Sequence, residues 1–329
     1  MTLLVVGGAG YIGSTVASAA RDSGRDVVVL DNLSVGREEF TAGCAFYRGD
    51  MADGELVDRV FAEHPDIDAV VHCAALTVVP DSVAEPLRYY RENVAKTVDL
   101  LDHLRRNDCR RLVFSSSASV YGNAGPVVDE DTPVEPGSPY ARTKVMVEQV
   151  LADLAAAEPG WRILALRYFN PIGADPQRRS GPTSPRPGHV LGKLLTAQAD
   201  GEPFTITGTD YPTRDGSGLR DYVHVWDLAL AHVAAIERLD DVVDAGRPYL
   251  VINLGSGTGV TVRELAAAVN RQVKPQVTVQ EGPRRPGDPA GAVATVERAR
   301  TLLGWLPTAT LDDAVRDALA WQKLGIGRR

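Results

Sequence analysis

Short apolar segments alternate with longer amphipathic segments through the first half of this 329-residue chain. The apolar segments are rich in Val, Ile and Leu without polar alternation, which is typical of strands covered on both faces of a parallel sheet. We predict strands at residues 3–6, 27–30, 69–71, 111–114 and 163–166. We predict helices, from apolar residues at helical spacing, over residues 14–23, 55–63, 84–106 and 141–157. This alternation predicts an α/β fold with a doubly wound parallel sheet.

The pattern changes after residue 170. Residues 171–188 are dense in Pro, Gly, Ser and Arg, which predicts a long loop at a domain boundary and leaves open whether it is a lid. A helix over 190–199, a strand end and helix over 222–238, and a buried strand over 249–254 follow, and we expect the last two segments to return to the parallel sheet. The predicted domains are 1–170 plus 220–254, and a smaller α/β domain of 171–219 plus 255–329.

Composition and charge narrow the class of protein. Lys and Arg number 35 and Asp and Glu 43, a net charge of -8 that disfavours nucleic acid and anionic membrane as partners. Cys44, Cys73 and Cys109 form no C-x-x-C pair, so we expect no metal site and a reducing cytoplasm. The sequence shows no secretory leader and no apolar run of 18 residues, from which we expect neither secretion nor membrane spanning.

Three glycines, Gly7, Gly10 and Gly13, follow the first predicted strand and open the first predicted helix. At such a turn the backbone approaches a pyrophosphate at a helix N-terminus, which favours nucleotide binding over a ligand-free turn. Asp31 ends the second predicted strand, where a carboxylate accepts hydrogen bonds from the adenosine ribose and repels a 2′-phosphate. The pattern therefore favours NAD over NADP, although Asp31 with Asn32 is also a common start of a turn.

Tyr140 and Lys144 lie at positions i and i+4, on one face of a helix that Pro139 helps to begin. A phenol is a poor base at neutral pH, but a nearby ammonium and an oxidised nicotinamide both stabilise the phenolate. Residues 114–122 contain four serines and follow a predicted strand at the edge of the sheet where ligands of open α/β sheets bind. Such a tyrosine can take a proton from a sugar hydroxyl, and a serine hydroxyl at this edge can hold the substrate oxygen. Without Tyr140 and Lys144, a serine-rich turn that satisfies its own backbone would be the favoured interpretation.

Together the glycine turn, the serine segment and Tyr140-x-x-x-Lys144 resemble the extended short-chain dehydrogenase/reductase superfamily, which implies a Rossmann-type sheet. Four more blocks run in order over the rest of the chain, at residues 166–174, 208–213, 218–225 and 253–257. With these blocks the chain resembles the UDP-glucose (UDP-galactose) 4-epimerase family. The resemblance covers nearly the whole chain.

The resemblance implies an NAD cofactor, a UDP-sugar substrate and three catalytic residues. Tyr140 is the implied base, Lys144 its electrostatic partner and nicotinamide-ribose ligand, and Ser117 the hydroxyl that bonds the sugar O4. The implied cofactor contacts are Gly7, Gly10, Tyr11, Ile12, Gly13, Asp31, Asn32, Asp50, Met51, Cys73, Ala74, Leu76, Asn93, Ser115, Tyr140, Lys144 and Tyr168. The implied substrate contacts are Ser117, Tyr140, Asn170, His189, Thr205, Thr207, Arg220, Arg285, Asp288 and Ala292.

The chain departs from the family pattern at four positions. Thr77 stands where the family often has a Lys that contacts the cofactor, and Gly192 replaces a common Pro. Thr207 stands where an aromatic ring often stacks on uracil. The position that gates sugar size in the family falls on Ala292, a small residue, so we expect room for an N-acetyl group at the sugar C2.

The reaction implied by the resemblance is 4-epimerisation, an isomerase activity of the EC 5.1.3 class. Tyr140 takes the proton from the C4 hydroxyl while hydride passes to NAD⁺, the 4-keto sugar turns over, and hydride returns to the opposite face. A 4,6-dehydratase is disfavoured because Ala118-Ser119 stand where those enzymes carry Asp-Glu. A UDP-pentose or UDP-hexuronate 4-epimerase stays open as the alternative, whereas intact Ser117, Tyr140 and Lys144 argue against a non-catalytic NAD-sensing module.

The predicted helices over 84–106 and 141–157 are amphipathic and partly apolar outward. Similar proteins pair these helices across a four-helix dimer contact, which implies a homodimer.

Overall fold

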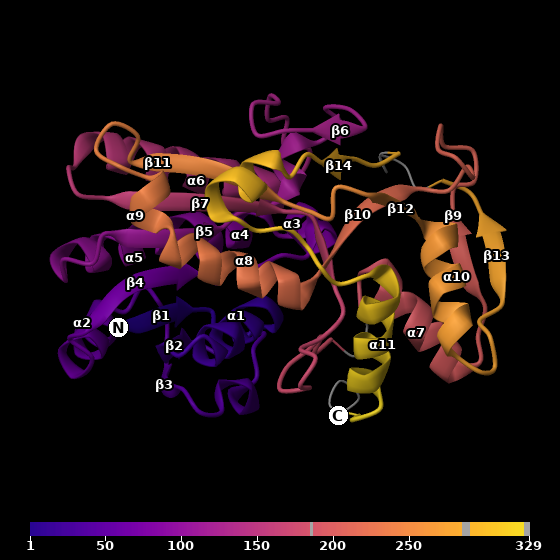
Figure 1. Cartoon of the computed structure of the whole chain (residues 1–329), viewed down its shortest axis with the longest axis horizontal. Helices are drawn as coiled ribbons and strands as arrows, with labels where there is room; N and C mark the ends of the chain where they lie inside the picture. The colour runs from indigo at the N-terminus through magenta and orange to yellow at the C-terminus, as the bar shows by residue number, and fades with distance from the viewer. Residues whose placement is uncertain (185–186, 285–289, 326–329) are drawn as a thin grey trace.

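The computed structural model describes residues 1–184, 187–284 and 290–325 and centres on a seven-stranded parallel sheet (Figure 1). The strand order is β11-β7-β5-β4-β1-β2-β3, which confirms the predicted doubly wound fold of the Rossmann type. Six strands match predicted segments; the seventh, β3, is a short, half-exposed edge strand without an apolar run. The strands are β1 (Thr2–Val6), β2 (Asp26–Asp31), β3 (Ala45–Arg48), β4 (Ile67–His72), β5 (Arg111–Ser115), β7 (Arg162–Tyr168) and β11 (Tyr249–Leu254).

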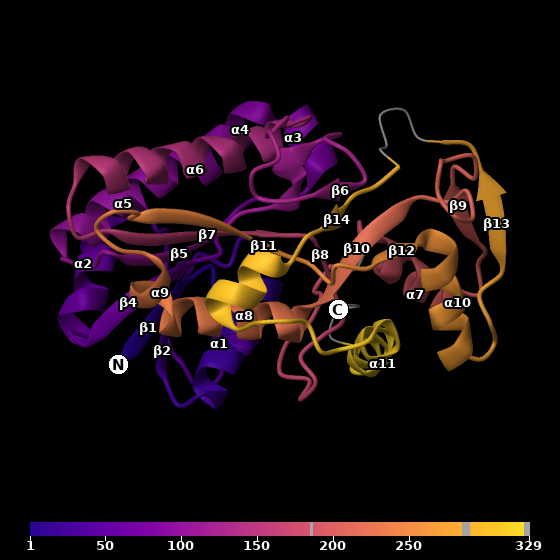
Figure 2. The same cartoon turned by 45° about the horizontal axis from the view of Figure 1, so that its top comes forward.

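Helices cover both faces of this sheet (Figure 2). One face carries α1 (Tyr11–Asp22), α8 (Val225–Glu237), α9 (Leu239–Val242) and the π-helical turn η4 (Ala299–Leu303). The other face carries α2 (Gly54–Glu63), α3 (Val79–Ala84), α4 (Pro86–Tyr90), α5 (Lys96–Arg106) and α6 (Pro139–Ala157). This two-sided cover explains why the strands have no polar face.

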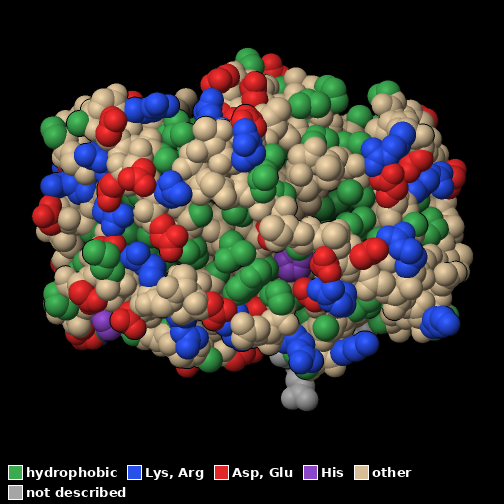
Figure 3. All heavy atoms as spheres, viewed as in Figure 1, with side chains coloured by type: hydrophobic (Ala, Val, Ile, Leu, Met, Phe, Trp, Pro, Cys, Tyr) green, Lys and Arg blue, Asp and Glu red, His purple; other side chains and the backbone are tan. Residues whose placement is uncertain are grey.

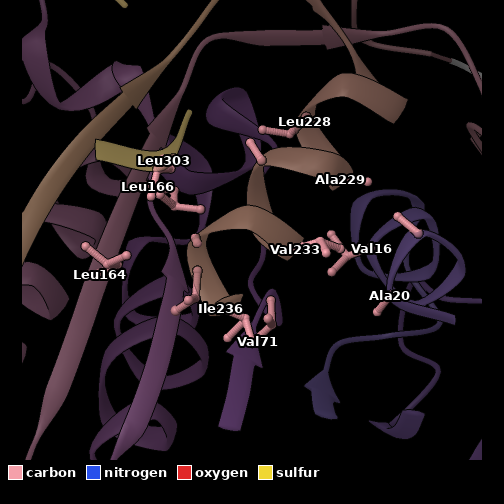
Figure 4. Close-up of a cluster of buried hydrophobic side chains, with 14 of the residues drawn as sticks. Val16, Ala20, Val71, Leu164, Leu166, Leu228, Ala229, Val233, Ile236 and Leu303 are labelled. Atoms are coloured by element: carbon pink, nitrogen blue, oxygen red, sulfur yellow. The ribbon is translucent and has the colours of Figure 1, made fainter. Parts of the chain in front are cut away.

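Strand β7 contributes side chains to two hydrophobic cores, one on each face of the sheet. Successive side chains of a strand point to opposite faces. Leu164 and Leu166 therefore join the core that contains Leu228 of α8 and Leu303 of η4 (Figure 4), whereas Ile163 and Ala165 join the core under α2, α5 and α6. Both cores are almost fully buried, so the sheet is a rigid platform for residues at its carboxyl ends.

The predicted single helix over 84–106 is wrong in its continuity. Glu85 ends α3, and Pro86, which has no N–H to donate, begins α4. A π-helical turn, η2 (Arg91–Ala95), then precedes α5. A π-helical turn holds one extra residue, and here the buried side chain of Asn93 lies within it.

The second half of the chain forms smaller sheets beside the large one. β10 (Leu219–His224) pairs with β8 (Asn170–Ile172) and β12 (Gly259–Thr261). The expectation that residues 222–224 return to the large sheet is therefore wrong, because β11 already occupies the outer edge of β7. The remaining strands are β9 (Phe204–Thr207), β13 (Val279–Gly282), β6 (Val127–Val128) and β14 (Val293–Ala294). The remaining helices are η1 (Glu38–Thr41), η3 (Ala118–Tyr121), α7 (Val190–Asp200), α10 (Val262–Gln272) and α11 (Leu311–Gln322).

The first part of the predicted 171–188 loop is anchored on both sides. Asp175 is fully buried and pairs with Arg179 at 2.5 Å, and Arg179 also pairs with Asp22 of α1 at 2.7 Å. The indole N–H of Trp321 on α11 donates to the carbonyl of Pro182 at 2.9 Å. Residues 173–182 therefore form a fixed bridge between α1 and α11.

The surface shows no single-sign face in the view drawn: acidic and basic side chains are interspersed (Figure 3). Among the described residues, no helix combines the length and apolarity that a membrane span requires. Across the same parts of the chain, His, Cys, Asp and Glu side chains form no group of three suited to a metal ion.

Candidate active site

A cleft of about 220 Å³ lies at the carboxyl ends of β1, β2 and β4. β1 and β4 are neighbours in the sheet, but the helices that follow them cover opposite faces, which opens a crevice at this point. Thirteen of the seventeen predicted cofactor contacts line the cleft: Gly7, Gly10, Tyr11, Ile12, Gly13, Asp31, Asn32, Asp50, Met51, Cys73, Ala74, Leu76 and Tyr168. Asn93, Ser115, Tyr140 and Lys144 do not line it.

The three motif glycines at this cleft have different geometric roles. Gly7 has a φ of +81°, and a Cβ there would lie 2.5 Å from the backbone nitrogen of Ala74. A Cβ on Gly13 would lie 2.2 Å from the carbonyl oxygen of Gly7, whereas a Cβ on Gly10 would meet the same atom at an ordinary 3.4 Å. Gly10 also begins α1 without a side-chain cap. An uncapped helix N-terminus beside a close-packed backbone turn fits a dinucleotide pyrophosphate.

Asp31 has a structural role besides its predicted ribose contact. Its carboxylate accepts the backbone N–H of Ala9 at 2.9 Å and that of Leu33 at 2.8 Å, which ties the glycine turn to the end of β2. Each carboxylate oxygen keeps a further lone pair for a ribose hydroxyl. The side chain is thus oriented before any ligand arrives.

The sequence analysis did not name Lys96, which lines the cleft together with Glu92. Its ammonium lies 2.6 Å from Asp50 and 2.7 Å from Glu92. The i,i+4 spacing of Glu92 and Lys96 could have predicted their pairing, but the contact with Asp50 joins elements distant in sequence. Lys96 therefore fixes the carboxylate of a predicted cofactor contact.

Asn93 does not line the cleft but hydrogen-bonds Leu76, which does. Its side-chain amide accepts the N–H of Leu76 at 2.8 Å and donates to the carbonyl of Leu76 at 2.9 Å. It also donates to the Thr143 hydroxyl on α6 at 3.1 Å. The π-helical turn thus links the loop after β4 to the helix that carries Tyr140 and Lys144.

Ser117, Tyr140 and Lys144 lie close to one another, at the end of β5 and the start of α6. Ser138 caps α6 by accepting the N–H of Ala141, so the helix begins immediately before Tyr140. The Ser117 side chain lies beside the Tyr140 phenol. Burial raises the pKa of Tyr140, and the neighbouring Ser117 side chain lowers it.

Lys144 is buried, with 3% of its surface exposed, and its ammonium donates to the carbonyl of Ser115 at 2.8 Å. The ammonium also lies 4.8 Å from the ring centre of Phe114. Burial lowers the pKa of Lys144 to about 8. The amino group therefore loses its charge near pH 8 rather than near its usual 10.5.

Ser115 is the centre of a buried hydrogen-bond network. Its hydroxyl lies 3.1 Å from Nε2 of His232 and 3.2 Å from Sγ of Cys73, and the Tyr168 phenol lies nearby. His232 Nδ1 lies 2.8 Å from the carbonyl of Leu228, so Nδ1 carries the proton and Nε2 accepts from Ser115. Burial lowers the pKa of His232 to about 4, so the ring stays neutral.

A second cleft of about 570 Å³ contains three predicted substrate contacts, Thr205, Thr207 and Arg220. Lys193 and Tyr211 also line it, and the sequence analysis named neither as a site residue. The carboxylates of Asp200 and Glu202 line the same cleft, so its charge is mixed, and the two cationic side chains are the groups in it that suit an anionic ligand such as a diphosphate.

The other predicted substrate contacts are more dispersed. Asn170 is exposed and donates to the carbonyl of Asp221 at 3.1 Å. His189 caps α7 through a bond from the Gly192 N–H and lines a separate cleft of about 360 Å³ beside Trp321. Ala292 packs into the apolar cluster that contains Ala118, next to Ser117, and Tyr121. Arg285 and Asp288 lie outside the described residues.

Asp221 is not part of a surface ion pair with its neighbour Arg220. Its buried carboxylate accepts the N–H and hydroxyl of Ser256, both at 2.6 Å, and the N–H of Ala294 at 3.0 Å. It also accepts the N–H of Gly257 at 3.2 Å. Asp221 thus fastens two C-terminal segments against β10, while Arg220 lines the cleft.

The doubly wound sheet, the glycine-lined cleft at its switch point and the buried Tyr–Lys pair define a Rossmann-type enzyme of the short-chain dehydrogenase/reductase class. Residues 3–255 match the Epimerase family, described as the NAD dependent epimerase/dehydratase family. The chain is 44% identical over 325 residues to the UDP-glucose 4-epimerase of Azospirillum brasilense, covering 98% of this chain and 92% of that protein. It is 40% identical to that of Bacillus subtilis, covering 99% and 98%.

The solved structures agree. The UDP-glucose 4-epimerase of Stenotrophomonas maltophila, solved with bound NAD and formylated UDP-arabinopyranose, superposes with a TM-score of 0.93 at 38% identity, covering 99% of this chain and 98% of that one. The chain therefore belongs to the NAD dependent epimerase/dehydratase family and, within it, to the UDP-glucose 4-epimerases. The resemblance drawn from the motifs is confirmed.

Proposed function

We propose that Tyr140, Ser117 and Lys144 carry the NAD-dependent 4-epimerisation of UDP-glucose and UDP-galactose in this chain. The observation that supports this assignment is their arrangement: Ser117 lies beside a buried phenol, with a buried ammonium one helical turn away. Membership of the family supports the reaction, and this arrangement supports the roles assigned to the three side chains.

Tyr140 acts as the base toward the sugar O4, and Ser117 holds that oxygen beside it. Burial keeps the free phenol protonated at neutral pH, so the proton leaves only when positive charge is near. Lys144 supplies such charge while its bond to the Ser115 carbonyl fixes its position. The chemistry that a bound NAD would supply is reversible hydride transfer, by which the sugar C4 would lose a hydride and regain it on the opposite face of the 4-keto sugar.

The cofactor would be held along the first cleft. The glycine turn and the N-terminus of α1 suit its pyrophosphate, and Asp31 suits the adenosine ribose. Asp50, fixed by Lys96, lies on the same wall. Tyr168, which lines the cleft and lies near Ser115, brings the cleft close to the carbonyl that Lys144 contacts.

The nucleotide part of the substrate would occupy the second cleft, where Arg220 and Lys193 offer charge to a diphosphate. Ala292, in the cluster beside Ala118, would leave room for an N-acetyl group at the sugar C2. We therefore propose N-acetylated UDP-hexoses as further substrates. A UDP-pentose is the second candidate, since a solved relative was crystallised with a UDP-arabinopyranose derivative.

The test is to purify the chain without added NAD, record the absorbance of bound nicotinamide, and incubate it with UDP-galactose, UDP-N-acetylgalactosamine and a UDP-pentose. Interconversion of C4 epimers, followed by chromatography, is the expected result for the first two. Tyr140→Phe should abolish turnover, whereas Tyr249→Phe, which removes a buried hydroxyl that has no partner among the described residues, should not. Equal activity of the two variants would contradict the assignment.

The domain division also stays a proposal: residues 1–170 plus 220–254 for NAD, and 171–219 plus 255–329 for the nucleotide sugar. The two clefts support it, since the first is lined mainly by residues before 170 and the second mainly by residues after 187. Separate titration of NAD and UDP into single-site variants of each cleft would test it. Loss of both affinities from one substitution would contradict it.

We propose a homodimer and a cytoplasmic location as well. Val83, Leu87 and Met146 expose 64%, 66% and 40% of their surfaces on α3, α4 and α6, the helices on one face of the sheet (Figure 2). A charge placed on this patch, as in Leu87→Glu, should convert a dimer to a monomer in sedimentation at micromolar concentration. The three unpaired cysteines suit a reducing compartment, which fractionation of the source cells would test.

A further inference from the structure

Three consecutive serines, the first of them the last residue of β5, have side chains with different neighbours. Ser115 bonds His232, and Ser117 lies beside the Tyr140 phenol. Ser116, whose hydroxyl is fully buried, instead donates to Oε1 of Glu148 at 2.5 Å. Because successive side chains alternate in extended backbone, anchoring the middle serine fixes the direction in which its two neighbours point.

Glu148 lies on α6, one turn after Lys144, and exposes only 6% of its surface. Its carboxylate also accepts from the guanidinium of Arg167 on β7, with Nε–Oε1 at 2.9 Å and Nη2–Oε2 at 2.6 Å. Such a two-bond pair has a fixed geometry as well as a strong attraction. Both oxygens of this buried carboxylate are thus occupied, and none of its contacts belongs to the mechanism above.

Further hydrogen bonds connect the Glu148–Arg167 pair to the turn that follows Ser117. Arg167 donates through Nη1 to the Tyr121 hydroxyl at 3.0 Å, and Tyr121 donates to Oδ1 of Asn253 at 2.6 Å. Tyr121 ends η3, the turn that begins directly after Ser117. One cluster of hydrogen bonds therefore joins α6, β5, β7, η3 and β11 around the segment that carries Ser117.

We propose that Glu148 is a positioning residue for the epimerase reaction. Through Ser116 it sets the direction of Ser117, and through α6 it holds Lys144 at a fixed distance from Tyr140. Glu148 touches neither substrate nor reacting atoms, so it acts entirely through Ser117, Tyr140 and Lys144. The inference rests on the proposed function, in which the same three residues carry the chemistry.

The test compares Ser116→Ala and Glu148→Gln with matched controls in the same protein. Ser82→Ala removes another fully buried hydroxyl, and Asp175→Asn weakens another buried carboxylate–arginine pair, both outside the site. Turnover is expressed per NAD-binding site, counted by calorimetric titration with NAD, so that loss of folded protein does not count as loss of catalysis.

A displacement of about 1 Å in a reacting group costs up to about 100-fold in rate. Ser116→Ala should lower kcat about tenfold and Glu148→Gln about 100-fold, with KM for UDP-glucose within about twofold of wild type, because only the chemical step is affected. The two controls should keep wild-type kcat.

Two outcomes would overturn the inference, and they differ. If Tyr140→Phe is inactive but Ser116→Ala and Glu148→Gln keep wild-type kcat per site while melting earlier, the cluster has only a structural role. If Tyr140→Phe itself stays active, the proposed function falls and the inference with it. Ser116→Ala, which leaves the Glu148–Arg167 pair intact, decides the matter even where Glu148→Gln folds poorly.

Discussion

Gly10 and Gly13 occupy the same turn, yet the structure predicts opposite consequences for replacing them with alanine. A Cβ on Gly13 would lie 2.2 Å from the carbonyl oxygen of Gly7, inside any tolerable contact, so the turn must shift. Overpacking of this kind destabilises a protein by about 1–3 kcal/mol. A Cβ on Gly10 would meet its nearest atom at 3.4 Å, so the free protein should unfold at its normal temperature.

When NAD is added, we expect the larger effect from Gly10→Ala. At a concentration of about 100 times its Kd, a ligand stabilises the folded state by about 2.7 kcal/mol, which raises the Tm of a protein of this size by roughly 4 °C. Gly10 lies where the backbone must approach the pyrophosphate, so Gly10→Ala should lose this increase. Its Kd for NAD should rise about 100-fold, a cost of about 2.7 kcal/mol.

Thermal unfolding followed by tryptophan fluorescence, with and without NAD, separates the two effects, and calorimetry gives the Kd directly. Gly137→Ala is the matched control, because a Cβ there meets no atom within 4 Å. A Gly10→Ala protein that keeps the full NAD-induced increase in Tm, or a Gly13→Ala protein with an unchanged Tm, would refute the division of roles.

Three further predictions concern charge and size in the clefts. Because burial lowers the pKa of Lys144 to about 8, kcat should fall about tenfold between pH 7 and pH 9 as the ammonium is lost. A kcat that is flat to pH 9 would contradict this account. The same depressed pKa means that the unfolded chain binds more protons than the folded protein between pH 8 and 10.5. The contribution of Lys144 to the unfolding free energy should therefore rise over that range. Thr77 lines the cofactor cleft, so Thr77→Lys should lower the Kd for NAD about tenfold through one charge-assisted bond, and calorimetry showing no gain would place Thr77 away from the phosphates. Ala292→Tyr should lower turnover of UDP-N-acetylgalactosamine at least about tenfold while sparing UDP-galactose, and equal losses for both sugars in a competition assay would remove Ala292 from the sugar pocket.

The large sheet could be predicted from the sequence because its strands are buried on both faces. Their apolar runs, such as residues 249–254, contrast sharply with the amphipathic helices between them. β3 was not predicted, because a four-residue edge strand with half-exposed side chains has no such contrast. The π-helical turn was not predicted either, because an amphipathic pattern does not distinguish an inserted residue from regular helix.

The candidate site likewise contains residues that the sequence predicted and residues that it did not. The glycine turn and the Tyr140–Lys144 pair are close in sequence, so their spacing carries the geometry. Asn93, Lys96 and Glu148 act on partners from other elements, such as Leu76, Asp50 and Ser116. No local pattern encodes such contacts, because the fold itself brings the partners together.

The bridge between α1 and α11 has a consequence for how the protein is made. Trp321 stacks edge-on against Phe40, with ring centres 5.6 Å apart, and also holds Pro182. Residues from the first, middle and last parts of the chain thus meet at one point beside the cofactor cleft. On the ribosome, the glycine turn emerges long before α11, so this corner of the nucleotide-binding half stays unfinished until translation is almost complete. Long-range contacts of this kind slow folding, and a nascent chain stalled before residue 311 should remain open to proteolysis at residues 173–182.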